Sequence, residues 1–351
     1  MKTISEILLS LLILINLTAC KFVHDAKSGA TKSVSMNGNS LFHRMPERKM
    51  KTGSLQIEGE ILGAGEIKLD GYYKREVITK EVVMTNDSIL FIGAYRYKGY
   101  SLFDLINPYM LQKKNEAVFK PQIDAYIIVE NDENDRVVFS WSEIFHTSNP
   151  HQVLLATEAA PIVPYRKEVD YPFSETWKMV AANDLYSHRN LTNPTRIIVR
   201  TFDSKEYTID RNLKSMYSPT IELYIDSTYR VISARSDTFD KVKYLTTFYG
   251  MGMGYHPVDY FEGAPLQKFL PETMPFRVDF ARDGLVCMVG IDGYRTIFSY
   301  SELFNRMDQV QPILSTRENN KDEGYFRIYL PSDFFADRSV KSIKEIVFFQ
   351  P

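Results

Sequence analysis

The sequence carries two copies of the same segment. Residues 136–145 read RVVFSWSEIF and residues 295–304 read RTIFSYSELF, and six of these ten positions are identical. Average composition gives roughly 0.05 identities per position by chance. Upstream, KGYSLFDLI at 98–106 corresponds to EGAPLQKFL at 262–270. Matches that keep the same order indicate a duplicated domain, so the chain is restricted to folds that can be built twice.

A longer match closes each copy. Residues 177–199 align without a gap with residues 326–348. The offset between the copies changes slightly from one match to the next, so the loops have changed in length while the order of the elements has not. The alignment pairs Asp184 with Asp333 and Arg189 with Arg338.

The N-terminus reads as a targeting segment. Lys2 supplies a positive charge, and residues 7–17 are almost wholly apolar. The following Leu-Thr-Ala-Cys20 resembles the lipidation site of a bacterial lipoprotein signal. A transmembrane anchor is the alternative, but the apolar run is shorter than the roughly 20 residues that span a bilayer. We therefore predict a signal peptide at 1–19 and, at 20–52, a lipidated Cys20 with a flexible polar tether.

The charge balance bears on partners and location. Charged residues make up 25% of the chain and the formal net charge is −2. A nucleic-acid-binding surface needs a clustered basic excess, so we expect no nucleic-acid partner. Lys21 stands where an aspartate retains some bacterial lipoproteins in the inner membrane, which favours the outer membrane of the cell envelope. The remainder is long enough for two domains, predicted at 53–203 and 204–351.

Each copy contains the start of a helix. Ser140-x-x-Glu143 and Ser299-x-x-Glu302 fit a capping box. In this motif the serine side chain accepts a hydrogen bond from the glutamate amide, and the glutamate side chain accepts one from the serine amide. A serine nucleophile with a glutamate base is the alternative reading. Both copies preserve the spacing that a cap requires, so we predict caps and no catalytic residues.

The rest of each copy favours strands. Aromatic residues make up 13% of the chain, with 22 Tyr and 22 Phe, and such side chains favour strands and large cores. The closing apolar runs at 197–199 and 346–348 fit buried strands. Asp184 and Asp333 precede these runs and are predicted to organise turns through the backbone. We therefore predict a strand-rich α+β fold with a few short helices, present in tandem.

The order of the motifs resembles the sulfite-oxidase-type molybdopterin-binding domain. A Gly-x-x-Leu turn follows apolar strands, and Asp-Gly-Tyr, the Ser-x-x-Glu helix and a closing Pro-x-Asp…Arg-Ser-Val-Lys…Ile segment come after it. The resemblance covers nearly the whole chain after the signal, as two degenerate copies, and implies two molybdopterin-binding-like domains. The first copy has Asn134-Asp135 where the second has Gly293-Tyr294. The second copy carries Gly263, Leu266, Asp292, Gly293, Tyr294, Pro331, Asp333, Arg338, Ser339, Val340, Lys341 and Ile346, and the first keeps Gly99, Leu102, Leu105, Asp184, Arg189 and Ile197.

The cysteine that this family uses is missing here. In the family a cysteine thiolate and the dithiolene of the pterin hold molybdenum, a soft and redox-active metal. That cysteine would fall within 82–97 or 239–261, and neither segment contains one. With Cys20 lipidated, only Cys287 remains, and we predict that it is a buried structural thiol.

The resemblance also implies basic side chains on the pterin phosphate. Arg338 and Lys341 in the second copy and Arg189 in the first match those positions, and arginine suits bidentate phosphate contact. Thr192 replaces the lysine in the first copy. We therefore expect no cofactor, with molybdopterin as the alternative.

Two groups of residues could hold a metal ion. Met251-x-Met253-x-x-His256 lies in the run GMGMGYHP and gathers soft ligands suited to Cu(I), although thirteen methionines make such a run unremarkable. His146 and His151 flank a short loop whose spacing fixes no geometry. We predict no metal site, with the methionine run as the alternative.

Three functions follow from these observations. The first is a lipid-anchored, non-enzymatic protein that binds a small ligand or an envelope protein, since two packed copies create a groove between them. The second is a molybdopterin-dependent oxidoreductase with unusual metal ligation. The third is Cu(I) binding by the methionine run.

Overall fold

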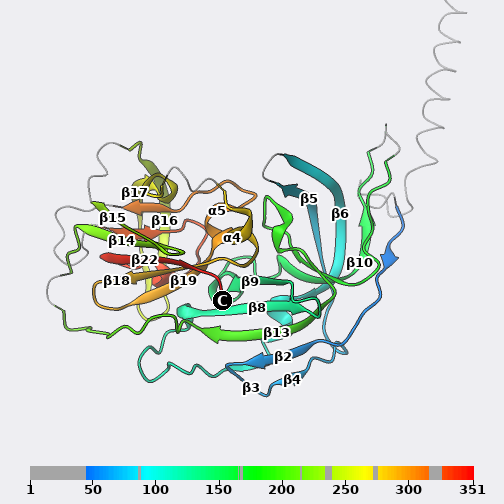
Figure 1. Ribbon diagram of the computed structural model, residues 1–351, viewed down its shortest axis with the longest axis horizontal. Coiled ribbons are helices and arrows are strands. Elements are labelled where there is room, and N and C mark those ends of the chain that lie inside the picture. Colours follow the sequence, from blue (N-terminus) through cyan, green and yellow to red (C-terminus); the bar gives the residue numbers. More distant parts are fainter. Residues whose placement is uncertain are drawn as a thin grey trace, which may run out of the picture.

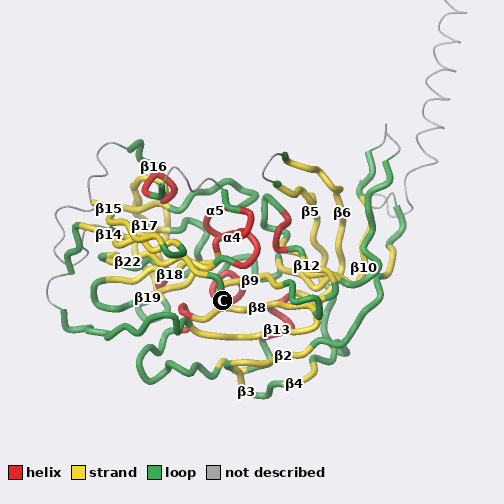
Figure 2. The backbone as a smooth tube through the Cα atoms, in the orientation of Figure 1, coloured by secondary structure: helices red, strands yellow, loops and turns green. Residues whose placement is uncertain are grey.

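The fold is mostly β. Strands make up 47% of the computed structural model and helices 12%, so the predicted α+β class is wrong (Figures 1 and 2). The helices that follow the capping serines end after five residues, little more than one turn, while the β-branched and aromatic runs pair as strands. The structure describes residues 45–351 apart from 86–87, 165, 167–168, 214–215, 234–238, 272–275 and 316–325.

The strands of the first half form two sheets and a short separate pair. They are β1 (Arg48–Lys49), β2 (Gln56–Gly59), β3 (Ile61–Leu62), β4 (Gly65–Glu66), β5 (Arg75–Met84), β6 (Ile89–Ser101), β7 (Met110–Leu111), β8 (Ala125–Asn131), β9 (Arg136–Ser140), β10 (Val153–Pro161), β11 (Lys178–Ala181), β12 (Leu191–Thr192) and β13 (Pro194–Thr201). One sheet has the order β12-β11-β10-β6-β5, with β1 against β10, and the other has the order β4-β2-β13-β8-β9. Strands β3 and β7 pair with each other.

The second half also forms two sheets. Its strands are β14 (Thr220–Ile225), β15 (Thr228–Ser233), β16 (Val242–Gly250), β17 (Gly254–Pro265), β18 (Leu285–Gly290), β19 (Arg295–Ser299), β20 (Ile313–Ser315), β21 (Arg327–Tyr329) and β22 (Ile343–Phe349). The sheet orders are β15-β14-β22-β18-β19 and β16-β17-β20-β21. The four larger sheets of the two halves are arranged like the blades of a four-bladed propeller.

Short helical turns connect the strands at equivalent places in the two halves. The first half has the α-helices α2 (Leu102–Ile106) and α3 (Trp141–Phe145) and the 3-10 helices η2 (Gln122–Asp124) and η3 (Ser187–Arg189). The second half has the α-helices α4 (Val278–Asp283) and α5 (Tyr300–Phe304) and the 3-10 helices η4 (Leu266–Phe269) and η5 (Ala336–Arg338).

The pairing pattern of the second half repeats that of the first. Strand β2 lies parallel to β13, which pairs with β8 and through it with β9. In the second half β14 lies parallel to β22, which pairs with β18 and through it with β19. The hairpin β5–β6 and the pair β10–β11 correspond to β16–β17 and β20–β21. The duplication seen in the sequence is therefore also a duplication of strand topology.

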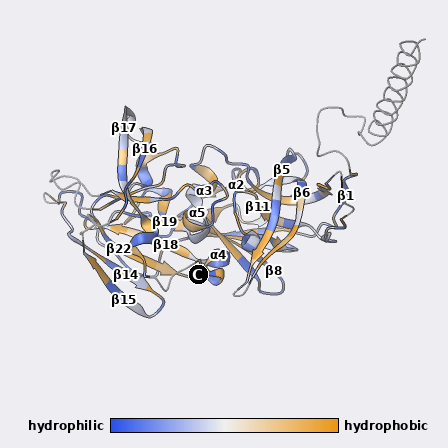
Figure 3. Cartoon of the chain, turned by 90° about the horizontal axis from the view of Figure 1, so that it is seen from above, coloured by the Kyte–Doolittle hydropathy of each residue, from blue (hydrophilic) through white to orange (hydrophobic). Residues whose placement is uncertain are grey.

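The central strands are buried on both faces, which explains their unbroken apolar sequence. In β8, Ile127 faces the core between the two sheets of the first half, whereas Ile128 faces the second half. In β18, Met288 faces the core of the second half, whereas Cys287 faces the first half. Much of the orange, hydrophobic colour in Figure 3 lies on strands. One apolar layer thus joins the halves, and the prediction of a buried thiol at Cys287 is confirmed.

The folded part begins before residue 53. Strand β1 pairs with β10, and Met50 is buried, so this end of the predicted tether packs on the first sheet. Cys20 and the signal peptide at 1–19 lie outside the described residues. Among the described helices, none has the length and apolar character needed to cross a bilayer.

Two equivalent glycines generate the first prediction. A Cβ on Gly99 would lie 2.0 Å from the Leu155 carbonyl oxygen, and one on Gly263 would lie 2.4 Å from that of Leu314. These contacts are with backbone, so we expect Gly99→Ala and Gly263→Ala each to lower the free energy of unfolding by about 1–3 kcal/mol. Urea denaturation would measure it.

Gly252→Ala is the matched control, because a Cβ there meets nothing within 4 Å. Its stability should stay within about 0.5 kcal/mol of the parent. If Gly99→Ala and Gly252→Ala unfold at the same urea concentration, the close strand approach in the first half is contradicted.

Candidate functional site

A buried arginine closes each half, and both belong to the residues that the sequence singles out. Arg189 ends η3, and its side chain is only 4% exposed. It donates to both carboxylate oxygens of Asp184 at 2.8 and 2.7 Å and to Glu143 at 2.7 Å. Its guanidinium also lies over the Phe139 ring. The cation is therefore balanced by two carboxylates of its own half.

Arg338 repeats this arrangement in the second half. It ends η5 and donates to both oxygens of Asp333 at 3.0 and 2.6 Å. It also donates to both oxygens of Glu302, at 3.1 and 2.8 Å, and lies over the Phe298 ring. The aspartates predicted to organise turns through the backbone are therefore the bidentate partners of the arginines, and that prediction is wrong.

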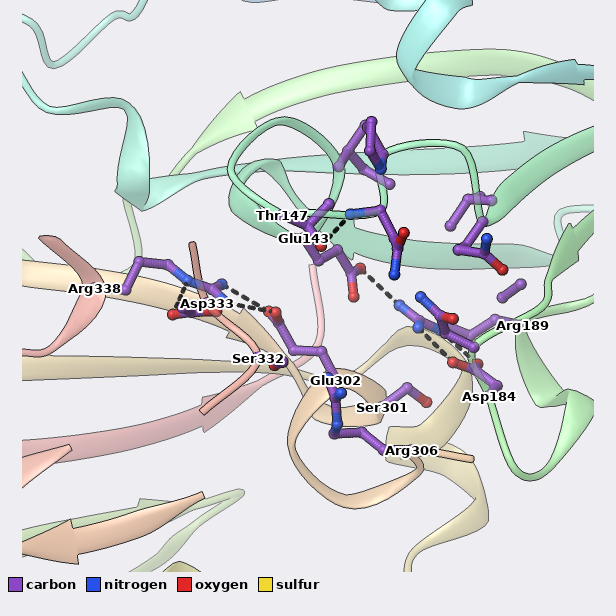
Figure 4. A pocket seen from close by; sticks show the side chains of 17 residues that line it. Glu143, Thr147, Asp184, Arg189, Ser301, Glu302, Arg306, Ser332, Asp333 and Arg338 are labelled. Carbon is purple, nitrogen blue, oxygen red and sulfur yellow. Dashed lines mark hydrogen bonds and ion pairs between the residues drawn. The ribbon is translucent and has the colours of Figure 1, made fainter. Parts of the chain in front are cut away.

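Each arginine also reaches the other half. Arg189 donates to the Ser299 hydroxyl at 3.1 Å, and Arg338 donates to the Ser140 hydroxyl at 3.2 Å. Ser299 in turn donates to Glu143 at 3.0 Å. The two halves therefore exchange equivalent contacts. We call the region around these arginines and serines the junction, and Figure 4 shows both arginines directed into it.

The same serines and glutamates cap the helices α3 and α5. In both helices the serine side chain accepts from the glutamate amide, and the glutamate side chain accepts from the serine amide. The predicted capping boxes are confirmed. Because these groups already hold helix ends and arginines, the serine–glutamate pairs lack the free general base that a nucleophilic serine needs.

Further exchanged contacts surround the arginines. Arg295 pairs with Asp124 at 3.0 Å, and the equivalent Arg136 pairs with Asp283 at 3.2 Å. Single backbone bridges join Thr147 to Asp333 and Asp184 to Arg306. The contacts run in both directions between the halves, which makes the junction approximately two-fold symmetric.

A small cavity lies between the arginines. Its volume is about 50 Å³, and it is lined by both arginines and by their four carboxylate partners. Burial raises the pKa of Glu143 to about 7, with Arg189 opposing and the Glu302 charge adding to the rise. Burial likewise raises the pKa of Asp184 and Asp333 against the effect of their arginines. Four carboxylates facing two guanidinium groups therefore favour the binding of a proton here.

These residues do not fit a molybdopterin. Pockets for ligands of that size enclose roughly 300–1,000 Å³, far more than this cavity offers. Arg189 and Arg338 direct their donors to carboxylates, so neither guanidinium is free for bidentate contact with a phosphate. Cys287 lies in the apolar layer between the halves, where burial raises the pKa of its thiol. We derive no reaction through this cofactor.

Lys341 is separated from Arg338 in the structure. It is exposed and lines a different hollow of about 240 Å³, together with Tyr294 and Arg327. The predicted phosphate-binding set is thus divided between the small cavity at the arginines and a separate surface hollow.

The predicted soft-metal ligands lie at a hairpin turn. Met251 and Met253 are exposed between β16 and β17, and the Met251 amide donates to Asp337. The side chain of His256 lies outside the described residues. His146 and His151 bond to different serines, Ser142 and Ser101, at 3.0 Å. Within the described part of the chain, no three His, Cys, Asp or Glu side chains are grouped as metal ligands would be.

A larger, open groove lies where the first half meets α4. It encloses about 870 Å³. Met84 and Thr85 at the end of β5 and His188 in η3 line it from the first half. Phe276, Arg277, Val278, Asp279 and Arg282, in and before α4, line it from the second half. In Figure 1, α4 lies at the edge of the second half that faces the hairpin β5–β6 of the first half.

Three rings lie together at the groove. The Tyr186 and Phe276 ring centroids lie 5.0 Å apart, and the His188 and Phe276 centroids lie 6.0 Å apart. Burial and the nearby Arg282 charge lower the pKa of His188, so its imidazole is neutral at neutral pH. Its Nε2 atom is buried and makes no hydrogen bond among the described residues. The groove thus combines the apolar side chains of Met84, Phe276 and Val278 with charged side chains from α4 and its start.

The chain was compared with known protein families and with curated proteins. No family matches it, and no curated protein matches it. The functional assignment must therefore come from the geometry of the groove and the junction.

The sequence reasoning missed the groove and the roles of the aspartates. The repeated Asp-x-x-x-x-Arg spacing, at Asp184 and Arg189 and again in the second copy, signals the ion pairs. The groove's residues differ between the copies, so a search for shared motifs passes over them. Asp283 in the second copy corresponds to Asp124 in the first. At the same offset, Phe276 corresponds to Ala117, and Arg282 corresponds to Ile123.

Removal of one junction arginine should be costly. Arg338→Gln leaves Asp333 and Glu302 buried without their cation, so we expect the free energy of unfolding to fall by about 3–5 kcal/mol. Arg230→Gln, on exposed β15, is the control and should change it by less than about 0.5 kcal/mol. Equal urea midpoints for the two variants would contradict the pairing.

The junction should also respond to pH. A folded-state pKa of about 7 at Glu143, above the ordinary value of 4.5, means that the folded chain binds a proton more readily than the unfolded chain. This contribution to stability is fully present below the unfolded pKa and is lost as the pH rises through 7. Relative to Glu143→Gln, we expect the parent to gain about 1 kcal/mol from pH 8 to pH 6.

The comparison with Glu143→Gln is needed because His146 acts in the opposite direction. Burial lowers the pKa of His146 to about 4. This histidine therefore lowers the stability of the folded protein as the pH falls below 6.5, the ordinary histidine pKa. Urea denaturation of parent and Glu143→Gln at several pH values isolates the glutamate. Parallel pH profiles for the two proteins would show that Glu143 does not take up the proton.

Proposed function

We propose that the protein is a non-catalytic, lipid-anchored protein of the bacterial cell envelope that binds a small ligand. The anchor follows from the sequence before and at Cys20, where acyl chains would hold the folded part on a membrane surface. The groove beside α4 is the binding site. The observation that carries this proposal is its size, about 870 Å³, formed by side chains of both halves.

Several features support binding over catalysis. The carboxylates Glu143, Glu302, Asp184 and Asp333 are held in ion pairs with the junction arginines. The cavity that these carboxylates line encloses only about 50 Å³, too little for an organic substrate to reach them. A volume of this order suits a small organic molecule, and sites at the junction of two domains are common for such ligands.

Native mass spectrometry of the protein purified from its own host tests the proposal. We expect an organic ligand to be retained, and to be lost from Val278→Trp, because the new ring fills the groove from α4. Thr85→Trp fills the groove from the first half and should also lose the ligand. This second variant keeps the test valid if Val278→Trp fails to fold. Val231→Trp, on exposed β15, is the matched control and should keep the ligand.

Two results would overturn this function. Near-stoichiometric molybdenum in the purified protein, or a fluorescent pterin released on denaturation, would instead support the molybdopterin-dependent oxidoreductase. A parent protein that retains nothing after exposure to a small-molecule extract of its host would remove the ligand-binding function.

A further inference from the structure

The groove contains one exposed basic group that suits a negative charge. Among the described residues Arg282 makes one ion pair, with Asp135 at 3.3 Å, and its side chain is 48% exposed. Such a surface pair is weak, so its guanidinium is available to a stronger acceptor. The His188 ring lines the same groove, and its Nε2 atom is buried without a hydrogen-bond partner among the described residues.

The other charges of the groove are already balanced. Arg277 donates to Asp226 at 2.7 Å and to Asp279 through two of its nitrogens. Arg282 therefore carries the charge that a ligand would meet, and a monoanion complements it. A carboxylate offers two acceptor oxygens and can meet the guanidinium with both.

Rings form the apolar part of the same groove. Phe276 is half-buried and packs against Tyr186 and His188, while Met84 and Val278 lie on the two sides. Aromatic rings prefer offset-stacked or edge-to-face contacts with other aromatic rings, and thioethers also favour rings. A flat ring is thus suited to the position beside Phe276.

We infer that the groove binds a small aromatic carboxylate, with the carboxylate on Arg282 and the ring against Phe276 and His188. This inference rests on the proposed function and names its ligand class. The equivalent positions of the first copy, Ala117 and Ile123, lack both the ring and the charge. The duplicated fold therefore offers one such site at α4.

Phenylacetate is the probe, with 2-phenylethanol as a neutral analogue and phenylethylammonium as the opposite charge. The full-length protein in detergent is labelled on histidine, and the chain contains six histidines. The ring signal of His188 is assigned by its loss in His188→Gln. We expect phenylacetate to shift that signal, and the two analogues to bind about tenfold more weakly or not at all.

Arg282→Gln should weaken the binding of phenylacetate by about tenfold and leave the binding of 2-phenylethanol unchanged, because only the charged contact is removed. Arg230→Gln is the control and should bind phenylacetate like the parent. Equal binding of phenylacetate and 2-phenylethanol, or full binding by Arg282→Gln, overturns the carboxylate class. The proposed function then still stands if Val278→Trp loses the host ligand, and it fails if the parent retains none.

Discussion

The contact on which the molecule depends is the one between each buried arginine and the opposite half. Arg189 and Arg338 each bind two carboxylates of their own half and one capping serine of the other. The same serine hydroxyls cap the helices α3 and α5. Helix caps, ion pairs and the joining of the halves are therefore one network, and loss of one member leaves charge buried without compensation.

The groove depends on this junction. Helix α4 packs against η3, the turn that ends in Arg189, so the arginine that joins the halves also fixes one wall of the groove. The groove's second wall comes from the end of β5, and the Val82 amide there donates to Ser187 of the same turn. A ligand held between β5 and α4 would contact both halves and stabilise their packed arrangement.

The sequence revealed what both copies share. The duplication, the capping boxes and the closing strands all appear as repeated patterns, because local propensity and periodicity determine them. The class was misjudged, since the Ser140 and Ser299 helices are recognisable at their starts while nothing in the sequence marks how soon they end. The ion pairs of Arg189 and Arg338 could not be told from phosphate-binding arginines, because burial is a property of the assembled junction. The groove depends on Phe276 and Arg282, which only one copy carries.

The central claim is that the two halves are one cooperative unit joined by the crossed arginines. Differential scanning calorimetry of the protein tests it most directly. The account predicts a single transition whose calorimetric enthalpy equals the van't Hoff enthalpy. Unfolding of either half removes the Arg295–Asp124 and Arg136–Asp283 pairs, the serine contacts of the buried arginines and one side of the shared apolar layer. Two separable transitions, each about half of the total enthalpy, would contradict it.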